Sequence, residues 1–292
     1  MAQDVVIKNV KDRIDAIEDV GTLPQVMARI LAIVEDDSST ALDLASEISR
    51  DQALTMRILR AVNSAYYGFQ RQILTVPEAV VILGFNEVER LALAIAVINT
   101  LGMDRENVKA LRLVWRHSMA CSVGGTVFEQ RFAGAMPEVR GAHVAGLLHD
   151  IGKAIISQYF PEAVPAVTNK VTDEGLSVIE AEREVLDGHT HCDIGAWMAS
   201  RWSLPQSLVD SIALHHEPDK VSRENVMVHA THVIDEICNS LGMLTLNVPY
   251  VCRLNADSAA MFQHGDELVH AVQEQLDKNQ RLLGAVGSGA MF

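Results

Sequence analysis

Histidine rings beside carboxylates are the side chains of this sequence best suited to chemistry. The sequence contains 11 histidines, and His149 and Asp150 are adjacent in the apolar stretch LLHDIGK. Burying a carboxylate beside an imidazole is costly unless its charge is compensated. A first-row divalent metal ion compensates that charge directly, because imidazole and carboxylate are both good ligands for such ions. Lys153 lies one helical turn after His149, where an ammonium group suits a phosphate oxygen or another anion.

Further histidines lie on segments whose apolar residues have helical spacing. They are His117, His191, His215, His216 and His232. A helix bundle can build a polar metal site in its centre from side chains on facing helices, and these histidines are placed along the chain as such a site requires. Gly195 follows His191 by one turn. Because glycine has no side chain, this position predicts a close approach by another helix.

Each of these histidines also has a plainer interpretation. A single histidine in a helix, such as His117, is commonly only packed in the core, and His215 with His216 could form a solvated helix end that complements the helix dipole. We expect the remaining histidines to be structural or exposed. They are His143, His189, His229, His264 and His270.

The elements that would carry these residues are helices. Apolar residues recur with helical spacing through almost the whole chain, as at Val26, Ile30 and Val34. Residues typical of helix starts are Thr40 with Asp43, Asp51, Thr75 with Glu78, and Asn86. Longer helical patterns cover 107–132, 139–160, 176–186, 191–202, 205–215 and 222–241. Only 243–254 is ambiguous, and Pro249 counts against a central strand there. The pattern predicts an all-α fold.

The helical segments divide into two groups. We expect an N-terminal helical bundle over residues 1–105, packed on a larger helical bundle over 106–242, and a C-terminal extension over 243–292. The stretch Leu101-Gly102-Met103-Asp104 is the expected joint between the bundles. In the extension, Leu268, Val272 and Leu276 form one apolar stripe, which predicts an amphipathic helix packed on the second bundle. A helix that binds a partner is the alternative.

Composition and charge exclude several classes of protein. The chain has 292 residues, of which 49% are hydrophobic and 21% charged, so it is not an intrinsically disordered chain. Its formal charge of −14 argues against non-specific binding of nucleic acid or of an anionic membrane. The four cysteines match neither a zinc ribbon nor a disulfide framework, which favours free thiols. With no apolar stretch near the roughly 18 residues that span a bilayer, we expect a cytoplasmic protein.

A DNA-binding interpretation rests only on two short helical patterns. The segments 40–50 and 52–62 superficially resemble a helix-turn-helix. The second of them offers only Arg57 and Arg60 as cations, and its apolar positions are typical of a core. We therefore expect no nucleic-acid partner.

Several longer motifs identify a resemblance to a known family. The N-terminal half carries LPQVMARILAIVEDD, DQALTMRILRAVNSAYYG and ILTVPEAVVILGFNEVERLAL, and the second half carries LLHDIGK and HTHCDIGAWMASRWSLPQSLVDSIALHHEP. From about residue 20 to 240 the chain resembles the HDOD family, the HD-related output domain of bacterial signalling. That family is related to the HD superfamily of metal-dependent phosphohydrolases. The resemblance implies that the second bundle is HD-like.

The resemblance also implies a role for each residue of the expected metal centre. His117 would be the first ligand, His149 and Asp150 the defining pair, and Asp150 the bridge if two ions bind. Lys153 would contact a phosphate. His191 and His215, with His216 as a further candidate, would hold a second ion.

Two positions depart from the HD pattern. The segment EPDKVSREN stands where the cyclic-dinucleotide phosphodiesterase branch has a Gly-Tyr-Pro motif. The last aspartate ligand of HD enzymes aligns with His232, whereas Asp235 is out of phase by nearly a turn. A site with fewer carboxylates favours Fe, Mn, Ni or Zn over Mg²⁺. The expected cofactor is therefore one or two of these divalent ions.

Two functions follow from the resemblance. Many HDOD members have lost parts of the HD centre, so the first is a signal-transduction output module that contacts signalling proteins or a small phosphorylated ligand. The N-terminal bundle, which an HD hydrolase does not need, favours it, and its segment Asn63–Gly68 would lie between the halves. The second is an active phosphohydrolase or phosphodiesterase on a nucleotide-type phosphoester, with Asp150 and Lys153 as catalytic residues. A homodimer is compatible with either function.

Overall fold

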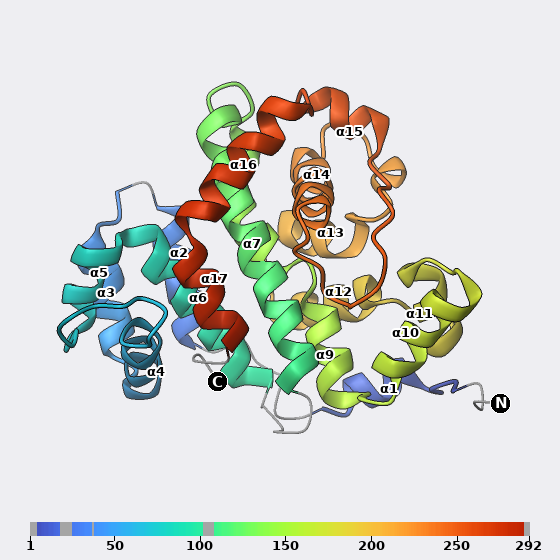
Figure 1. Ribbon diagram of the computed structural model, residues 1–292, viewed down its shortest axis with the longest axis horizontal. Coiled ribbons are helices and arrows are strands. Elements are labelled where there is room, and N and C mark those ends of the chain that lie inside the picture. The colour runs from blue at the N-terminus through green and yellow to red at the C-terminus, as the bar shows by residue number, and fades with distance from the viewer. Residues whose placement is uncertain (1–4, 18–24, 37, 102–107, 289–292) are drawn as a thin grey trace.

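The computed structural model describes residues 5–17, 25–36, 38–101 and 108–288, and within these ranges every regular element is a helix (Figure 1). The predicted all-α fold is confirmed. The ambiguous segment 243–254 forms no strand. In the part of the chain that the structure describes, none of the helices combines the length and apolar character that a bilayer span requires.

The N-terminal bundle consists of five helices. They are α2 (Gln25–Glu35), α3 (Ala41–Ser49), α4 (Gln52–Val62), α5 (Val76–Leu83) and α6 (Phe85–Leu101). Three predicted caps are confirmed: the side chains of Thr40, Asp51 and Thr75 each accept a hydrogen bond from a backbone N–H in the first turn. Asn86 does not cap α6, because the helix already begins at Phe85, directly after the Gly84 that ends α5.

Asn63 closes α4 and holds the segment that follows it. Its side-chain amide donates to the carbonyls of Leu59 and Ile73, both at 2.8 Å, and accepts from the Ile73 N–H at 2.8 Å. The neighbouring Tyr66 lies against the last helix of the chain, where a Cβ placed on Gly284 would lie 2.4 Å from its ring. The Asn63–Gly68 segment is thus fastened to its surroundings by the Asn63 side chain and contacts the C-terminal extension through Tyr66.

The second bundle is built around one long central helix, α7 (Val108–Phe132). Around it lie α8 (Ala142–Leu148), α9 (Ile151–Tyr159), α10 (Ala163–Glu174), α11 (Val178–Val185), α12 (His191–Arg201), α13 (Gln206–Leu214) and α14 (Val226–Ser240). The pattern predicted over 139–160 is two helices, because the chain turns at His149 and Asp150. Helix α10 lies in a stretch outside the predicted helical segments. Of the expected joint at 101–104, Leu101 is the last residue of α6, and 102–104 lie outside the described ranges.

The two ends of the chain pack on the second bundle. Helix α1 (Val10–Asp15) lies beside α9 and α10 rather than with α2–α5 (Figure 1). The Ile7 N–H donates to the Val185 carbonyl at 2.7 Å, and Arg201 donates to the Ile14 carbonyl at 3.0 Å. The boundary predicted for the N-terminal bundle therefore needs a correction at its start, because residues 5–17 belong with the second bundle.

The C-terminal extension contains α15 (Ala256–Met261), α16 (Asp266–Lys278) and α17 (Gln280–Ser288). The predicted amphipathic helix is two helices with a break at Asn279. Both run along α7 (Figure 1), and Leu268, Val272 and Leu276 are buried. The prediction that this stripe packs on the second bundle is confirmed.

Candidate metal centre

Two glycines allow α9 and α12 to approach each other until their backbones touch. A Cβ placed on Gly152 would lie 1.9 Å from the His191 carbonyl oxygen and 3.0 Å from the Gly195 nitrogen. A Cβ on Gly195 would lie 2.7 Å from the Ile212 side chain of α13. The predicted close approach at Gly195 is therefore confirmed. This contact brings the start of α9, with Asp150, against the start of α12, with His191.

Asp150 lies at the centre of the cluster, and its two carboxylate oxygens face different groups of histidines. One carboxylate oxygen, Oδ2, is 3.6 Å from Nε2 of both His117 and His149. The other oxygen, Oδ1, is 3.2 Å from His191 Nε2 and 3.7 Å from His215 Nε2. Asp150 is at the N-cap position of α9, where its side chain makes no capping hydrogen bond and instead lies between the two groups of histidines. Each group and the oxygen facing it can share one ion.

The first group joins α7, α8 and α14. His117 Nε2 lies 3.2 Å from His149 Nε2 and 3.0 Å from Asp235 Oδ1. The distance from His149 Nε2 to Asp235 Oδ1 is 3.6 Å. All three side chains are buried. Cys121 lies one turn along α7 from His117, with its Sγ 3.4 Å from His117 Nε2.

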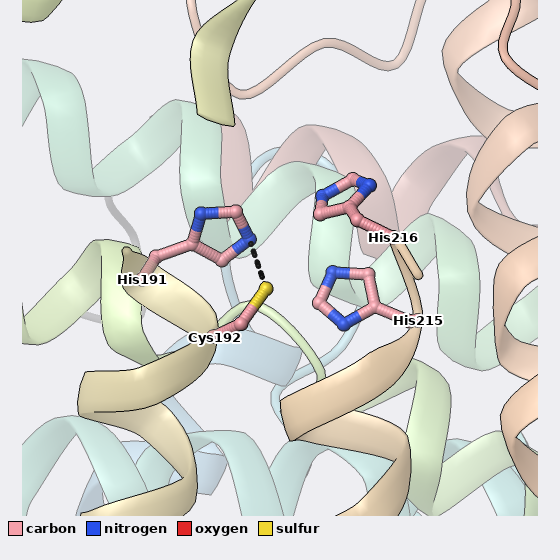
Figure 2. Close-up of side chains that lie close together, drawn as sticks. All are labelled: His191, Cys192, His215 and His216. Atoms are coloured by element: carbon pink, nitrogen blue, oxygen red, sulfur yellow. Dashed lines mark hydrogen bonds between the residues drawn. The ribbon is translucent and has the colours of Figure 1, made fainter. Parts of the chain in front are cut away.

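The second group joins the start of α12 to the end of α13. Figure 2 shows His191, Cys192, His215 and His216 with their side chains converging on one point. Cys192 Sγ is 3.4 Å from His191 Nε2. His191 and His215 are fully buried, whereas 23% of the His216 side chain is exposed. His216 is therefore the histidine of the centre nearest to solvent.

Hydrogen bonds at the outer ring nitrogens orient the buried histidines. The Nδ1 atoms of His117, His149 and His215 donate to the backbone carbonyls of Met243, Gly146 and Ile212. Because a carbonyl only accepts, Nδ1 carries a proton in each of these rings, and Nε2 is the nitrogen that faces the centre. His191 Nδ1 pairs at 2.7 Å with the Glu182 carboxylate. Such partners fix ring orientation and tautomer in metal sites.

Three buried polar atoms of the centre have no hydrogen-bond partner. Asp150 Oδ1, Asp235 Oδ2 and His215 Nε2 are inaccessible and have no hydrogen bond. Leaving a buried polar atom unpaired costs about 1–3 kcal/mol, and more for a charged group. A divalent cation would satisfy all three atoms, because each is a lone-pair donor. The residues present therefore fit a metal site.

Charge balance in the centre keeps its carboxylates ionised. Burial alone would raise the pKa of Asp150, but the Lys153 ammonium, 2.7 Å from Oδ2, and the His149 ring hold it well below its usual range. Burial is likewise outweighed at Asp235, where hydrogen bonds from His117 and His149 keep the pKa well below normal. Both aspartates are therefore anionic ligands at neutral pH.

The histidines divide according to their neighbours. Burial lowers the pKa of His215 to about 4, and burial together with the neighbouring His215 lowers the pKa of His216. Burial opposes the charged form of His149 as well, but the Asp150 and Asp235 carboxylates raise its pKa above the ordinary value. His215 and His216 are thus neutral at pH 7, the form in which imidazole binds a metal.

The structure corrects the last member of the predicted ligand set. His232 donates from Nδ1 to the His215 carbonyl at 2.7 Å and accepts at Nε2 from the Asn255 N–H at 2.9 Å. Both of its ring nitrogens are hydrogen-bonded, so in this structure His232 holds the end of α13 and turns no lone pair toward the centre. Asp235, one turn along α14, faces His117 and His149 instead. Helix α14 is buried from Val226 to Cys238, so its apolar pattern does not show which side faces the centre.

Two thiols also lie at the centre, although cysteine spacing gave no sign of them. The available signals were position i+4 from His117 for Cys121 and adjacency to His191 for Cys192. Neither position has meaning until α7 is known to pack on α8 and α14, and α12 on α13. The remaining predicted residues, which are His117, His149, Asp150, Lys153, His191, His215 and His216, all lie at or beside the centre.

Access to the centre is narrow. A space of about 30 Å³ lies beside Lys153, with Glu182, Thr245 and Leu246 in its walls. That volume is of the order of a single water molecule. The segment 243–255 passes over the centre, held by the His117–Met243 bond and by the Asn255 N–H on His232. This segment therefore covers one side of the centre.

The fold and the site together define a class of domain. It is a helical bundle in which buried histidines and aspartates from facing helices converge. A family model described as the HDOD domain matches residues 20–218. The chain belongs to the HDOD family.

Comparison with individual proteins agrees with this assignment. The chain is 26% identical over 210 residues to an uncharacterized protein of Treponema pallidum, covering 69% of this chain but only 38% of that relative. An HDOD domain protein of unknown function from Geobacter sulfurreducens has the same fold, with a TM-score of 0.71, 23% identity and 97% of each chain covered.

Two further solved structures share the fold. One, from Shewanella amazonensis, is provisionally named a phosphohydrolase, with a TM-score of 0.64, 21% identity and coverage of 96% of this chain and 97% of that one. The other, from Marinobacter aquaeolei, is provisionally named a signal transduction protein, with a TM-score of 0.73, 20% identity and coverage of 98% of this chain and 61% of that one.

Proposed function

We propose that this chain is a signal-transduction output module whose second bundle holds one or two divalent metal ions. The observation that carries the proposal is the convergence of unpaired buried donors, Asp150 Oδ1, Asp235 Oδ2 and His215 Nε2, on one place in the bundle. Membership of the HDOD family supports the signalling role.

The ligands would divide between the two oxygens of Asp150. His117, His149 and Asp235 would hold one ion and His191, His215 and His216 the other, with Asp150 between them. Imidazole-rich donor sets favour Fe, Mn, Ni or Zn over Mg²⁺. Because these ligands come from α7, α8, α12, α13 and α14, a bound ion would also stabilise the packing of the bundle.

The closed centre favours an output role over turnover. The space beside Lys153 is about 30 Å³, and the six proposed ligand residues other than His216 are each at most 1% exposed. Output would then pass through protein contacts. We propose other signalling proteins or a small phosphorylated ligand as partners, in the cytoplasm, with a homodimer as one arrangement.

An active phosphohydrolase is the second candidate, and two observations favour it. Asp150 presents one oxygen to each group of ligands, and the Lys153 ammonium lies 2.7 Å from Asp150 Oδ2, where it could bind a phosphoryl oxygen. A bound metal ion would supply Lewis-acid polarisation of the phosphoester.

Metal analysis of the purified chain tests the proposal. We expect one or two equivalents of Fe, Mn, Ni or Zn in the unmodified protein and in Asp173→Asn, an exposed matched control. Asp150→Asn should lose the metal, because it removes the charge shared by both groups. Retention of the same metal content by Asp150→Asn, or no uptake by the unmodified protein after reconstitution, would refute the metal centre.

A phosphoester screen then separates the two candidate functions. Phosphodiesters and phosphomonoesters, nucleotides among them, would be incubated with the metal-loaded protein. Turnover that disappears in Asp150→Asn and persists in Asp173→Asn would favour the hydrolase. Absence of turnover in a protein that holds its metal would favour the output module.

A further inference from the structure

Each end of the metal centre contains one cysteine in contact with a ligand histidine. Cys121 Sγ is 3.4 Å from His117 Nε2, and Cys192 Sγ is 3.4 Å from His191 Nε2. Both residues are buried. Buried cysteine is often only a small apolar side chain, so the position of the sulfur relative to the other donors decides between packing and ligation.

The donor distances at the first end match a tetrahedral ligand set. Zinc–nitrogen bonds of about 2.0–2.1 Å place neighbouring ligand atoms about 3.3 Å apart in a tetrahedron, and a sulfur ligand lengthens its edges slightly. The distances from His117 Nε2 to His149 Nε2, to Asp235 Oδ1 and to Cys121 Sγ are 3.2, 3.0 and 3.4 Å. All three distances are close to a tetrahedral edge, so the thiol lies where a ligand sulfur can stand, while Asp150 Oδ2 is a longer contact at 3.6 Å from His117 Nε2.

The second end needs an anionic ligand. His191, His215 and His216 are neutral donors when they bind a metal. Asp150 Oδ1 lies 3.2 Å from His191 Nε2, whereas the Glu182 carboxylate contacts the outer nitrogen of His191, Nδ1. The Lys153 ammonium, 2.7 Å from Asp150 Oδ2, already offsets the charge of Asp150. A divalent ion in a buried site requires nearby negative charge. Cys192, whose sulfur lies among the three rings (Figure 2), can supply it as a thiolate.

We propose that a cysteine thiolate ligates the metal at each end of the centre, Cys121 with His117, His149 and Asp235, and Cys192 with His191, His215 and His216. The inference rests on the proposed metal centre. On binding, each thiol loses its proton to solvent as the metal–sulfur bond forms, so one proton leaves for each thiolate. Thiolate ligands select Zn²⁺ or Fe²⁺ over harder ions such as Mg²⁺.

Cobalt substitution gives a direct measurement. The full chain, stripped of metal, would be reconstituted with Co²⁺ and its absorption recorded from the near-ultraviolet to the visible. Visible d–d bands report cobalt bound in a low-coordinate site, and a near-ultraviolet sulfur-to-cobalt charge-transfer band reports thiolate ligation. The variants are Cys121→Ser, Cys192→Ser, the double variant, and Cys252→Ser as the exposed control.

We expect the charge-transfer band in the unmodified protein and in Cys252→Ser, a part of it in each single variant, and none in the double variant. A band that survives in the double variant, or d–d bands without any charge-transfer band, would overturn thiolate ligation while leaving the metal centre intact. A single variant with an undiminished band would overturn the assignment of that cysteine. Absence of cobalt uptake would instead refute the proposed metal centre.

Folding of the variants is checked separately. Circular dichroism and the unfolding midpoint of each metal-free variant would be compared with those of the metal-free parent. Cys121→Ala replaces Cys121→Ser if the buried hydroxyl destabilises the fold. X-ray absorption of the zinc-loaded parent, which requires no variant, should show sulfur in the first coordination shell, and a shell of only nitrogen and oxygen would overturn the proposal.

Discussion

Substitution of Gly152 by alanine should separate α9 from α12 and disrupt the centre. The added Cβ would lie 1.9 Å from the His191 carbonyl oxygen, whereas ordinary contact begins at 3.4 Å, so the two backbones must part by about 1.5 Å. The distance from Asp150 Oδ1 to His191 Nε2 is only 3.2 Å. Metal sites tolerate about 0.2 Å in ligand distance, so a shift of this size should remove the second end of the centre.

The energetic effect is also expected to be large. Overpacking of a well-packed core typically costs about 1–3 kcal/mol and occasionally more. Here the obstacle is backbone on the facing helix rather than a flexible side chain, so we expect a loss of about 3 kcal/mol or more in the free energy of unfolding. Urea unfolding of metal-free Gly152→Ala measures that loss without a contribution from metal binding.

Gly134 supplies a matched control, because a Cβ there has nothing within 4 Å. Gly134→Ala should change the free energy of unfolding by no more than about 0.5 kcal/mol and retain the parent's cobalt uptake. A Gly152→Ala protein with the parent's stability and cobalt spectrum would refute the argument that backbone contact between α9 and α12 builds the site.

The remaining predictions concern α14 and the buried network beside the centre. Asp235→Asn should abolish tight metal binding at the first end, whereas His232→Asn should weaken it by about 10–100-fold, the usual effect of losing a partner that orients a ligand; equal losses in zinc titrations would contradict the corrected assignment. Hydrogen bonds that the His143 ring donates to the Glu129 and Glu89 carboxylates outweigh burial and raise the pKa of His143 from 6.5 to about 10. Because the folded-state pKa is the higher one, this stabilisation is complete below about pH 6.5 and is lost as pH rises toward 10, with an upper limit of about 5 kcal/mol. Urea unfolding at pH 7 and pH 10 should show this loss of unfolding free energy in the parent and a much smaller loss in the double variant Glu89→Gln/Glu129→Gln. An equal loss between the two pH values in both proteins would contradict the role of His143.

Local interactions explain which helix boundaries the sequence predicts. A cap is made between residues three apart, so Thr40 with Asp43 and Thr75 with Glu78 identify their helices without knowledge of the fold. Asn86 misleads for the same reason: it is a good capping residue, but Gly84 has already ended α5 and the next helix starts at once.

Such local patterns do not predict on which bundle the first helix of the chain packs. Ile7, before α1, and Ile14, within it, contact Val185 and Arg201, which lie more than 170 positions away. The apolar spacing of α1 is equally compatible with packing on either bundle. Only the assembled surface of the second bundle decides where α1 lies.

For the centre itself, the sequence determines which residues carry the chemistry. His149, Asp150 and Lys153 lie within one turn, and the motifs around His117, His191 and His215 mark the other donors. What only the tertiary structure decides is which face of each helix points inward. It places Asp235 rather than His232 beside His117, and brings two thiols to the histidines. The physical reason is that α14 is buried all round and the glycine contact of α9 with α12 sets the separation, so rotation and distance follow from packing among helices far apart in the chain.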